Sequence, residues 1–248
     1  MSIAGKTFRR TVSPLIPGSW KRRVKGALFD VPDTENSLRR MKKLGFAPRT
    51  VIDVGAYVGD WTRTCKQLFP EARVLMVEPQ VAKASALAQV AADLRDVEAR
   101  SVLLGATEGA NVDFYEAESG SSVLRESAQP RPPTGQLAMS TLDAITADGP
   151  FARPDFIKLD VQGYELQVLK GGEHTLRSAE AVLMEVNLLA LHEGVPLFHQ
   201  AAEFMGKRGF QVYDLCSFIR RPYDGALWQV DVVFIGSSSH LVSSSRWC

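Results

Sequence analysis

The spacing of apolar and polar residues along the chain predicts an alternation of short strands and amphipathic helices. Apolar runs rich in β-branched residues predict strands at 50–54, 74–77, 100–104, 155–160 and 181–186. Apolar residues at helical spacing predict helices at 35–45, 60–69, 82–94, 163–176 and 197–208. The order of strand, helix and strand is typical of a parallel sheet whose right-handed crossovers place helices on both faces. The sequence therefore predicts an α/β fold with a mostly parallel central sheet.

Two regions depart from this simple alternation. Residues 211–215 and 230–235 are predicted to pair as closing strands, which gives the sheet an antiparallel C-terminal strand. In the middle of the chain, residues 112–115 alternate like an additional strand. Residues 117–136 are rich in Ser, Pro, Gly and Gln and are predicted to form a loop. Because it exceeds ordinary connections in length, we expect that loop to be functional or partly mobile.

The composition of the 248 residues is that of an ordinary globular protein, with 45% hydrophobic and 23% charged residues. No apolar run approaches the roughly 18 residues of a membrane-spanning helix. The patterning predicts one α/β domain at 36–236, between an N-terminal extension at 1–35 and a Ser-rich tail at 237–248, which we expect to be loose. A chain of this length needs no disulfide or metal to fold.

The cysteines and histidines give little sign of a metal site. The three cysteines contain no Cys-x-x-Cys pair, which argues against a disulfide framework or a zinc ribbon and fits a reducing compartment. The four histidines form no metal-binding pattern. Because the N-terminus lacks an apolar leader, the predicted localisation is cytoplasmic. An organelle transit peptide is the alternative, since acidic residues are missing before Asp30.

The near-neutral net charge of +1 conceals two oppositely charged regions. Residues 1–50 carry twelve Lys or Arg against three Asp or Glu, whereas the remaining 198 residues carry 17 basic against 25 acidic groups. Residues 6–25 are therefore candidates for contact with an anionic surface or a second subunit, with a solvated basic segment as the alternative. No nucleic-acid-reading motif occurs, so nucleic acid is not an expected partner, and a homo-oligomer is left open.

The first candidate site residues follow the strand at 50–54. Gly55 and Gly59 lie in a turn before a helix, where the backbone can approach a ligand closely. Their spacing is not the Gly-x-Gly-x-x-Gly of dinucleotide-binding proteins. Asp53 precedes the turn, and an acid there suits a cationic ligand better than a pyrophosphate. The alternative is a tight structural turn with Asp60 as a capping residue.

The second candidate is Glu78, at the end of the strand 74–77 and 23 residues after Gly55. An acid at this position accepts hydrogen bonds from ribose hydroxyls, which indicates a nucleoside ligand. It does not distinguish a nicotinamide cofactor from S-adenosylmethionine. A surface helix start before Pro79 is the alternative interpretation.

Two further acids end neighbouring strands. Asp160 ends the strand 155–160, and Glu185 lies at the end of the strand 181–186. Two acids that share a cleft raise one another's pKa, so they are candidates for a general base or for ligands of a divalent ion. Solvated strand-end acids are the alternative. His192 is a third candidate base because its unperturbed pKa is nearest neutrality.

Taken together, these segments resemble the FkbM family of S-adenosylmethionine-dependent methyltransferases over roughly residues 43–236. The resemblance rests on Val-Ile-Asp-Val-Gly-Ala-Tyr-Val-Gly-Asp-Trp at 51–61, Ser-Thr-Leu-Asp-Ala-Ile at 140–145, and the segment 155–173 that contains Lys-Leu-Asp-Val-Gln-Gly-Tyr-Glu. Residues 120–124 resemble a serine-rich element of the family, which implies that the long loop lies over the cofactor or the acceptor. The implied fold is Rossmann-like, of the class I methyltransferase type.

The resemblance also implies roles for single residues. Asp53, Gly55 and Gly59, with Ala56 between them, would border the methionine portion of S-adenosylmethionine, Glu78 the ribose, and Ser122 and Asp160 the region near the methyl group. Family members mostly methylate oxygen, often a hydroxyl of a sugar or a secondary metabolite. Tyr57 departs from the family, which has a small amide there. His192 also departs, because many relatives have an aromatic residue at its position.

The expected reaction is an in-line methyl transfer to a hydroxyl oxygen, with Asp160, Glu185 or His192 as the base. The acceptor would be a small molecule or a glycan, and a divalent metal is left open. A NAD(P)-dependent oxidoreductase is the first alternative, although the dinucleotide glycines and a Tyr-x-x-x-Lys pair are missing. A non-catalytic binding protein with a methyltransferase-like domain is the second.

Overall fold

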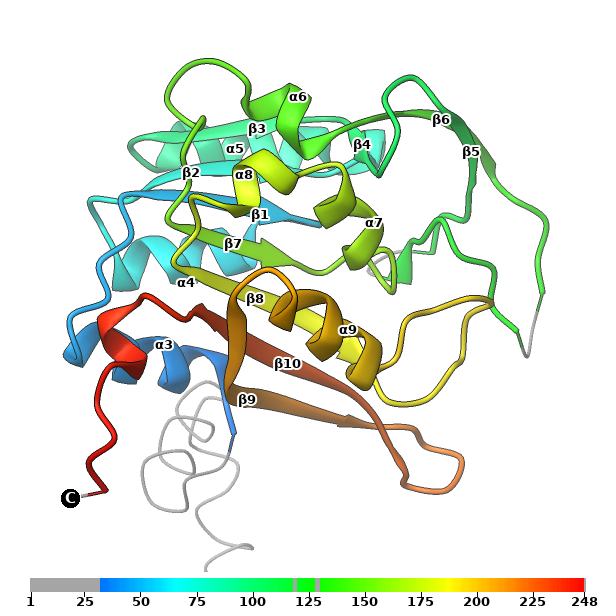
Figure 1. Ribbon diagram of the computed structural model, residues 1–248. Coiled ribbons are helices and arrows are strands. Elements are labelled where there is room, and N and C mark those ends of the chain that lie inside the picture. Colours follow the sequence, from blue (N-terminus) through cyan, green and yellow to red (C-terminus); the bar gives the residue numbers. More distant parts are fainter. Residues whose placement is uncertain (1–31, 118–119, 128–129, 248) are drawn as a thin grey trace, which may run out of the picture.

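The computed structural model describes residues 32–117, 120–127 and 130–247, and its centre is a seven-stranded sheet (Figure 1). The strand order is β3-β2-β1-β7-β8-β10-β9. The strands are β1 (Thr50–Val54), β2 (Arg73–Val77), β3 (Val97–Arg100), β7 (Phe156–Leu159), β8 (Ala181–Asn187), β9 (Phe210–Arg220) and β10 (Leu227–Gly236). Neighbouring strands pair in parallel except β10, which is antiparallel to both β8 and β9. The predicted α/β architecture is confirmed.

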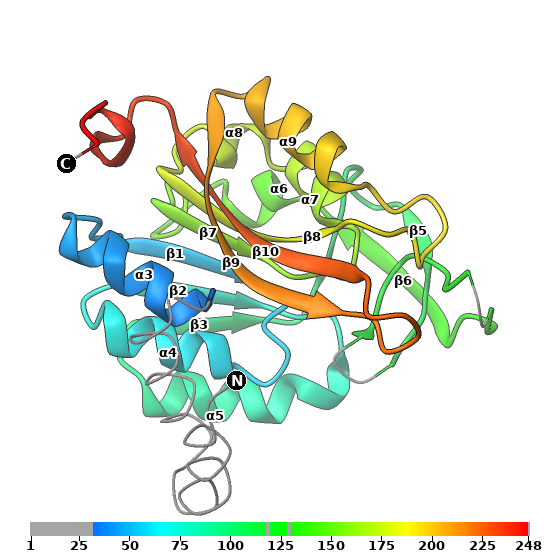
Figure 2. The same ribbon diagram turned by 90° about the horizontal axis from the view of Figure 1, so that it is seen from below.

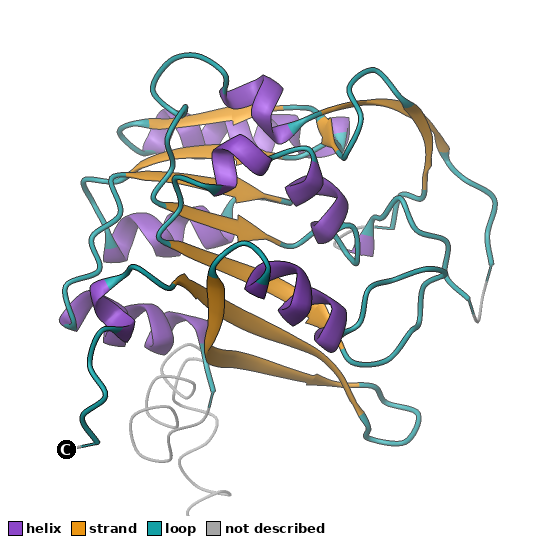
Figure 3. Cartoon of the chain, viewed as in Figure 1, coloured by secondary structure: helices purple, strands orange, loops and turns teal. Residues whose placement is uncertain are grey.

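Helices cover both faces of the sheet (Figures 2 and 3). One face packs against α3 (Thr34–Lys43), α4 (Asp60–Leu68) and α5 (Ala84–Asp93), and the 3-10 turn η1 (Val81–Lys83) precedes α5. The other face packs against α6 (Leu142–Thr146), α7 (Glu165–Lys170), α8 (Glu173–Leu176) and α9 (Phe198–Gly206). Strand β1 is buried on both faces, which explains its nearly continuous apolar sequence.

The predicted third strand at 100–104 is wrong in position. Strand β3 ends at Arg100, and Leu103–Leu104 instead form β4, which joins β5 (Asn111–Phe114) and β6 (Gly135–Ser140) in a small second sheet. Leu103 packs there against Phe114 and Met139. The predicted loop is correspondingly shorter, because residues 135 and 136 already belong to β6.

The predicted helix at 163–176 is divided into α7 and α8 at Gly171 and Gly172. A Cβ on Gly171 would lie 2.1 Å from the backbone oxygen of Gly105, so the chain approaches another backbone too closely for any side chain. The break is stabilised by Asp143, whose carboxylate accepts the backbone N–H groups of His174 at 3.0 Å and Thr175 at 2.7 Å. Tertiary contact therefore overrides the local helical pattern.

The C-terminal tail is docked at its beginning rather than loose. It forms a 3-10 turn, η3 (His240–Val242), in which Leu241 and Val242 pack against the core beside α3. The His240 side chain bonds the backbone oxygen of Leu44. Residues 243–247 are exposed.

The basic segment 6–25, predicted to contact an anionic surface, lies outside the described residues, as does most of the extension 1–35. Among the helices of the described ranges, none has the length and apolar character needed to cross a membrane.

Candidate active site

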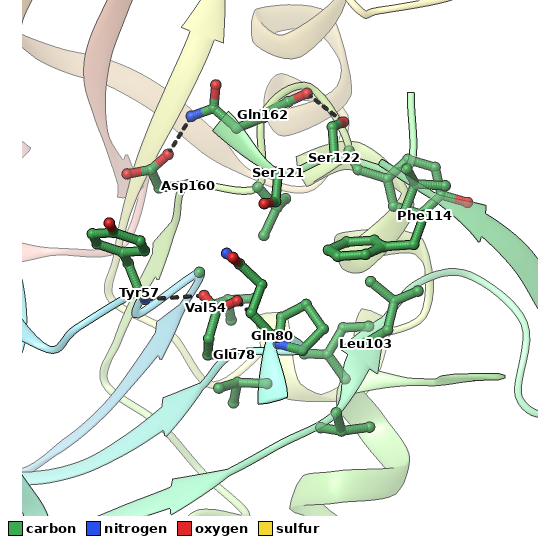
Figure 4. Close-up of a pocket in the computed structure, with 18 residues that line it drawn as sticks. Val54, Tyr57, Glu78, Gln80, Leu103, Phe114, Ser121, Ser122, Asp160 and Gln162 are labelled. Atoms are coloured by element: carbon green, nitrogen blue, oxygen red, sulfur yellow. Dashed lines mark hydrogen bonds between the residues drawn. The ribbon is translucent and has the colours of Figure 1, made fainter. Parts of the chain in front are cut away.

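A cavity of about 160 Å³ lies at the carboxyl ends of β1, β2 and β7 (Figure 4). This is the edge at which open parallel sheets bind ligands. Four of the residues predicted from the sequence line it: Gly55, Glu78, Ser122 and Asp160. Leu103 and Phe114 of the small second sheet provide apolar walls. Acidic groups at strand ends therefore face an apolar wall across one cavity.

The turn after β1 presents backbone rather than side chains to the cavity. Gly55 has a φ of +75°, and a Cβ on it would lie 1.8 Å from the backbone oxygen of Asp160. Only glycine fits this contact between two strand-end loops. Ala56 is buried, and its N–H donates to Val77. A Cβ on Gly59 would meet Val90 of α5 at 2.8 Å, so this glycine lies against a helix.

Asp53 lies at the centre of the sheet, and its carboxylate is engaged inside the protein. Its side chain is fully buried, accepts a hydrogen bond from Thr62 of α4 at 2.7 Å, and pairs with the Lys158 ammonium at 3.1 Å. A buried carboxylate needs such partners, because desolvation of an unpaired charge is costly. Neither Asp53 nor Lys158 belongs to the described cavity lining. The structure thus places Asp53 behind the site, and its predicted contact with a ligand remains a prediction.

Lys158 is an important residue that sequence reasoning missed. Burial alone lowers the pKa of a lysine, but the carboxylates of Asp53 and Asp160 outweigh it and raise the Lys158 pKa above its ordinary value. The ammonium also donates to the backbone oxygen of Gly55 at 2.8 Å and lies 3.7 Å from Asp160. The sequence did contain a sign of this role, because Lys158 lies within the otherwise apolar run of the strand predicted at 155–160.

Glu78 is held rigidly at the end of β2. Its side chain is buried, one carboxylate oxygen accepts the N–H of Tyr57, and the other accepts the N–H of Gln80, each at 3.0 Å. A carboxylate oxygen accepts more than one hydrogen bond, so both retain capacity for hydroxyl groups in the cavity. Tyr57 adopts a φ of +50°, and its ring stacks with the ammonium of Lys83 at 4.4 Å.

Asp160 and Glu185 are joined through Gln162. The amide nitrogen of Gln162 lies 3.0 Å from a carboxylate oxygen of Asp160 and 3.0 Å from one of Glu185. The Asp160 side chain is 41% exposed, whereas Glu185 is buried and also accepts from Gln229 at 2.7 Å. Burial, followed by the charge of Asp160, raises the pKa of Glu185 well above its ordinary value. Asp160 is therefore the member of the pair that faces the cavity.

Ser122 connects the long loop to this network. Its hydroxyl donates to the backbone oxygen of Gln162 at 3.0 Å and accepts the N–H of Leu124 at 3.0 Å. Ser121 and Ser122 line the cavity, so this part of the long loop lies beside the site (Figure 4). That the loop covers the cofactor or the acceptor stays a prediction.

His192 lies apart from the other two candidate bases. It borders a smaller cavity of about 40 Å³, together with Glu126, Arg131 and the far side of Ser122. Burial lowers its pKa, while the charge of Glu126 opposes that shift. The structure therefore places Asp160 on the larger cavity and His192 on the smaller one, while the buried Glu185 lines neither.

Glu165, the first residue of α7, is a second residue that sequence reasoning did not single out as functional. One oxygen of its carboxylate accepts the backbone N–H groups of Val161 and Gly163, each at 3.0 Å. Burial raises the pKa of Glu165 to about 7. It shapes the loop that carries Asp160 and Gln162.

Metal ligation has no geometric support in the described part of the chain. No group of three or more His, Cys, Asp or Glu side chains is arranged there to hold an ion. Asp160 and Glu185 instead share the amide donor of Gln162, which a metal ion bound between the two carboxylates would have to displace.

Comparison with known proteins gives a family. The model of the methyltransferase FkbM domain matches residues 53–212, well over half of the chain. The hexuronic acid methyltransferase AglP of Haloferax volcanii is 34% identical over 55 residues. That alignment covers 21% of this chain and only 23% of the length of the relative.

Solved structures of similar fold include two methyltransferases. The magnesium protoporphyrin IX methyltransferase ChlM of Synechocystis, determined with bound SAM, is 13% identical with a TM-score of 0.47, covering 95% of this chain and 92% of its own. The N-methyltransferase NodS of Bradyrhizobium japonicum, in complex with S-adenosylhomocysteine, is 10% identical with a TM-score of 0.48, covering 82% and 85%. The strand order of the sheet, with β10 as its antiparallel member, and the match to the FkbM domain agree with the Rossmann-like class I methyltransferase fold that the resemblance predicts.

Proposed function

Because the chain belongs to the methyltransferase FkbM domain family, we propose that it transfers the methyl group of S-adenosylmethionine to a hydroxyl oxygen of a sugar, a glycan or a secondary metabolite. The observation that carries this proposal is the cavity between Glu78 and Asp160, at the carboxyl ends of three parallel strands. In this proposal, Glu78 binds the ribose hydroxyls and Asp160 lies near the reacting end of the same cofactor.

The residues of the cavity fit this cofactor. Both oxygens of the buried Glu78 carboxylate keep capacity for hydroxyl donors, and an acidic side chain at Asp160 suits a nearby positive sulfonium. Leu103 and Phe114 provide apolar surface for a flat base. When bound, S-adenosylmethionine supplies an activated methyl group.

The protein has two tasks in the proposed reaction. It aligns the acceptor oxygen with the methyl carbon, and alignment of this kind contributes several kcal/mol to lowering a barrier. It also removes the hydroxyl proton, for which Asp160 is the leading candidate, because its carboxylate is half-exposed at the cavity. Glu185 and His192 remain alternatives. The single-turnover rates of Asp160→Asn, Glu185→Gln and His192→Ala distinguish them.

The acceptor class is proposed from two sources. The family resemblance favours hydroxyl oxygens, and the matching relative is by its name a hexuronic acid methyltransferase. A sugar acid is therefore the first acceptor to test, with incorporation of a labelled methyl group from S-adenosylmethionine as the measurement. Analysis of glycans and metabolites from a deletion strain, for species lighter by one methylene, identifies the natural acceptor.

Calorimetry separates this proposal from its alternatives. Binding of S-adenosylhomocysteine supports a methyltransferase, and NAD(P) binding in its place supports an oxidoreductase. If neither ligand binds, the result supports the non-catalytic binding protein. Unchanged activity after treatment with EDTA excludes a requirement for a divalent ion.

We also propose that the methyltransferase domain extends from residue 36 to residue 236 and that the protein is cytoplasmic. Residues 6–25 are proposed to contact an anionic surface, and the chain is a candidate homo-oligomer.

A further inference from the structure

Gln162 adopts a backbone conformation that glutamine rarely adopts. Its φ is +55°, in the left-handed region, and Gly163 follows with a φ of +98°. Residues held in this region often lie at functional sites, where surrounding contacts maintain them. Here the conformation turns the chain sharply after β7, so that the Gln162 side chain returns toward the end of its own strand (Figure 4).

From this position Gln162 contacts three segments that are distant in the sequence. Its amide donates to Asp160 at the end of β7 and to Glu185 of β8, while its backbone oxygen accepts the hydroxyl of Ser122 in the long loop. Within the described residues, Gln162 is the source of the hydrogen bond that the structure shows to the Asp160 side chain. One residue thus connects the candidate base, its acidic neighbour and the loop beside the cavity.

We propose that Gln162 is a positioning residue, which orients the Asp160 carboxylate toward the acceptor hydroxyl and separates it from Glu185. This inference rests on the proposed methyl transfer. The amide is suited to the task because it has two N–H donors and no charge. One donor bonds each carboxylate, so two acids on adjacent strands lie close together without direct contact.

The charges around Asp160 make a neutral donor necessary. The titratable groups that interact with it come from three strands and one helix: Lys158, Glu185, Asp231 and Glu165. A single cation therefore stands among several acids, and it is already paired with Asp53 at 3.1 Å. The Gln162 amide gives the Asp160 carboxylate a hydrogen-bond donor without adding another charge.

Gln162→Gly is a sharp test because glycine accepts a positive φ without strain. The variant removes the amide while relieving the backbone, so we expect a melting temperature no lower than that of the wild type. Asp96→Gly is the matched control, since Asp96 also has a positive φ, +58°, but lies at the opposite end of the sheet, before β3. A second variant, Gln162→Asn, tolerates the same backbone but is too short to bridge both carboxylates.

For Gln162→Gly we expect a single-turnover rate about 10²-fold below wild type, since small misplacements near reacting atoms have effects of that size. The affinity for S-adenosylhomocysteine and the KM for the acceptor should change little, and Asp96→Gly should react like the wild type. A purely structural role for Gln162 would instead lower the melting temperature or raise the KM for the acceptor.

Three outcomes decide the inference. If the wild type methylates and the single-turnover rate of Gln162→Gly equals that of Asp96→Gly, the positioning role is overturned while the proposed function stands. A lower rate accompanied by a lower melting temperature or a raised KM for the acceptor would also overturn it, because the loss would then come from a disturbed loop. If the wild type neither binds S-adenosylhomocysteine nor methylates, the proposed function fails.

Discussion

The loops after β1 and after β7 face each other at the centre of the sheet, yet they serve the cavity in opposite ways. The loop after β1 contributes backbone, because Gly55 allows the chain to touch the opposite loop and Asp53 points back into the protein. The loop after β7 contributes side chains, with Asp160 and Gln162 both on the cavity. One loop is adapted for close approach, and the other for chemistry.

The two loops are held together by groups that do not line the cavity. Lys158 of β7 pairs with Asp53 of β1 and donates to the backbone of Gly55. Glu165 fixes the backbone of the second loop from behind. A variant must therefore keep these contacts of Lys158 and Glu165 before a change in its rate can be assigned to chemistry.

The loop after β1 should be the more sensitive of the two to a single methyl group. Gly55→Ala combines a positive φ with a Cβ 1.8 Å from the backbone of Asp160, so we expect a loss of about 4 kcal/mol or more in the free energy of unfolding. Gly109→Ala is the control, because its φ is similar, +73°, with open space around it. Its loss in denaturant titrations should be about 1–2 kcal/mol. Equal losses would show that the contact between the loops contributes nothing.

Removing the cation between the loops should be nearly as damaging. Lys158→Met leaves the buried Asp53 without its ionic partner, which typically costs about 3–5 kcal/mol of unfolding free energy. Adding Asp53→Asn should restore much of that loss, since the uncompensated charge is then gone. Lys207→Met, which removes an exposed pair with Glu203, should leave the denaturation midpoint unchanged. A double variant as unstable as Lys158→Met would contradict the pairing argument.

Glu165, the first residue of α7, holds the loop after β7 and should make the free energy of unfolding depend on pH. The pKa of Glu165 is about 7 in the folded protein against an ordinary value of 4.5, so the folded state binds the extra proton between these values. The associated stability is fully present below pH 4.5 and is lost as the pH rises through 7, by about 3 kcal/mol in total.

Glu165→Gln keeps an oxygen that accepts the two backbone N–H groups and removes the titration. Urea denaturation at pH 5 and pH 8 should therefore show a smaller decrease for the variant than for the wild type. An identical decrease in both proteins would assign the pH dependence to other groups.

The smallest expected effect concerns ligand affinity. In Glu78→Gln, one of the two oxygens that accept N–H groups becomes an NH₂ group, and the hydrogen bonds to ribose lose their charge. We expect S-adenosylhomocysteine to bind about tenfold more weakly in calorimetry. Glu98→Gln, on the exposed part of β3, should bind like the wild type. Unchanged affinity in Glu78→Gln would remove the ribose assignment.

Several elements could be predicted from the sequence with accuracy. Strand β1 matches its predicted limits, because burial on both faces requires a continuous apolar run. The cavity residues Gly55, Glu78, Ser122 and Asp160 were also predicted, although the role of Ser122 came only from the family resemblance. Errors occurred where tertiary contacts override local pattern, as at the Gly171 break and in the early departure of Leu103 to the second sheet.

By itself, the sequence determined the order of strands and helices, the family, and the set of acids at the strand ends, because these depend on periodicity and on short local motifs. Only the tertiary structure decided which acids face the cavity. Asp53 and Asp160 look alike in the sequence, since both are acids at the end of a predicted strand. In the structure, Lys158, which follows Asp53 by 105 positions, pairs with the buried Asp53, whereas Asp160 is half-exposed. Charge and solvation are set by neighbours in space, and those neighbours come from distant parts of the chain.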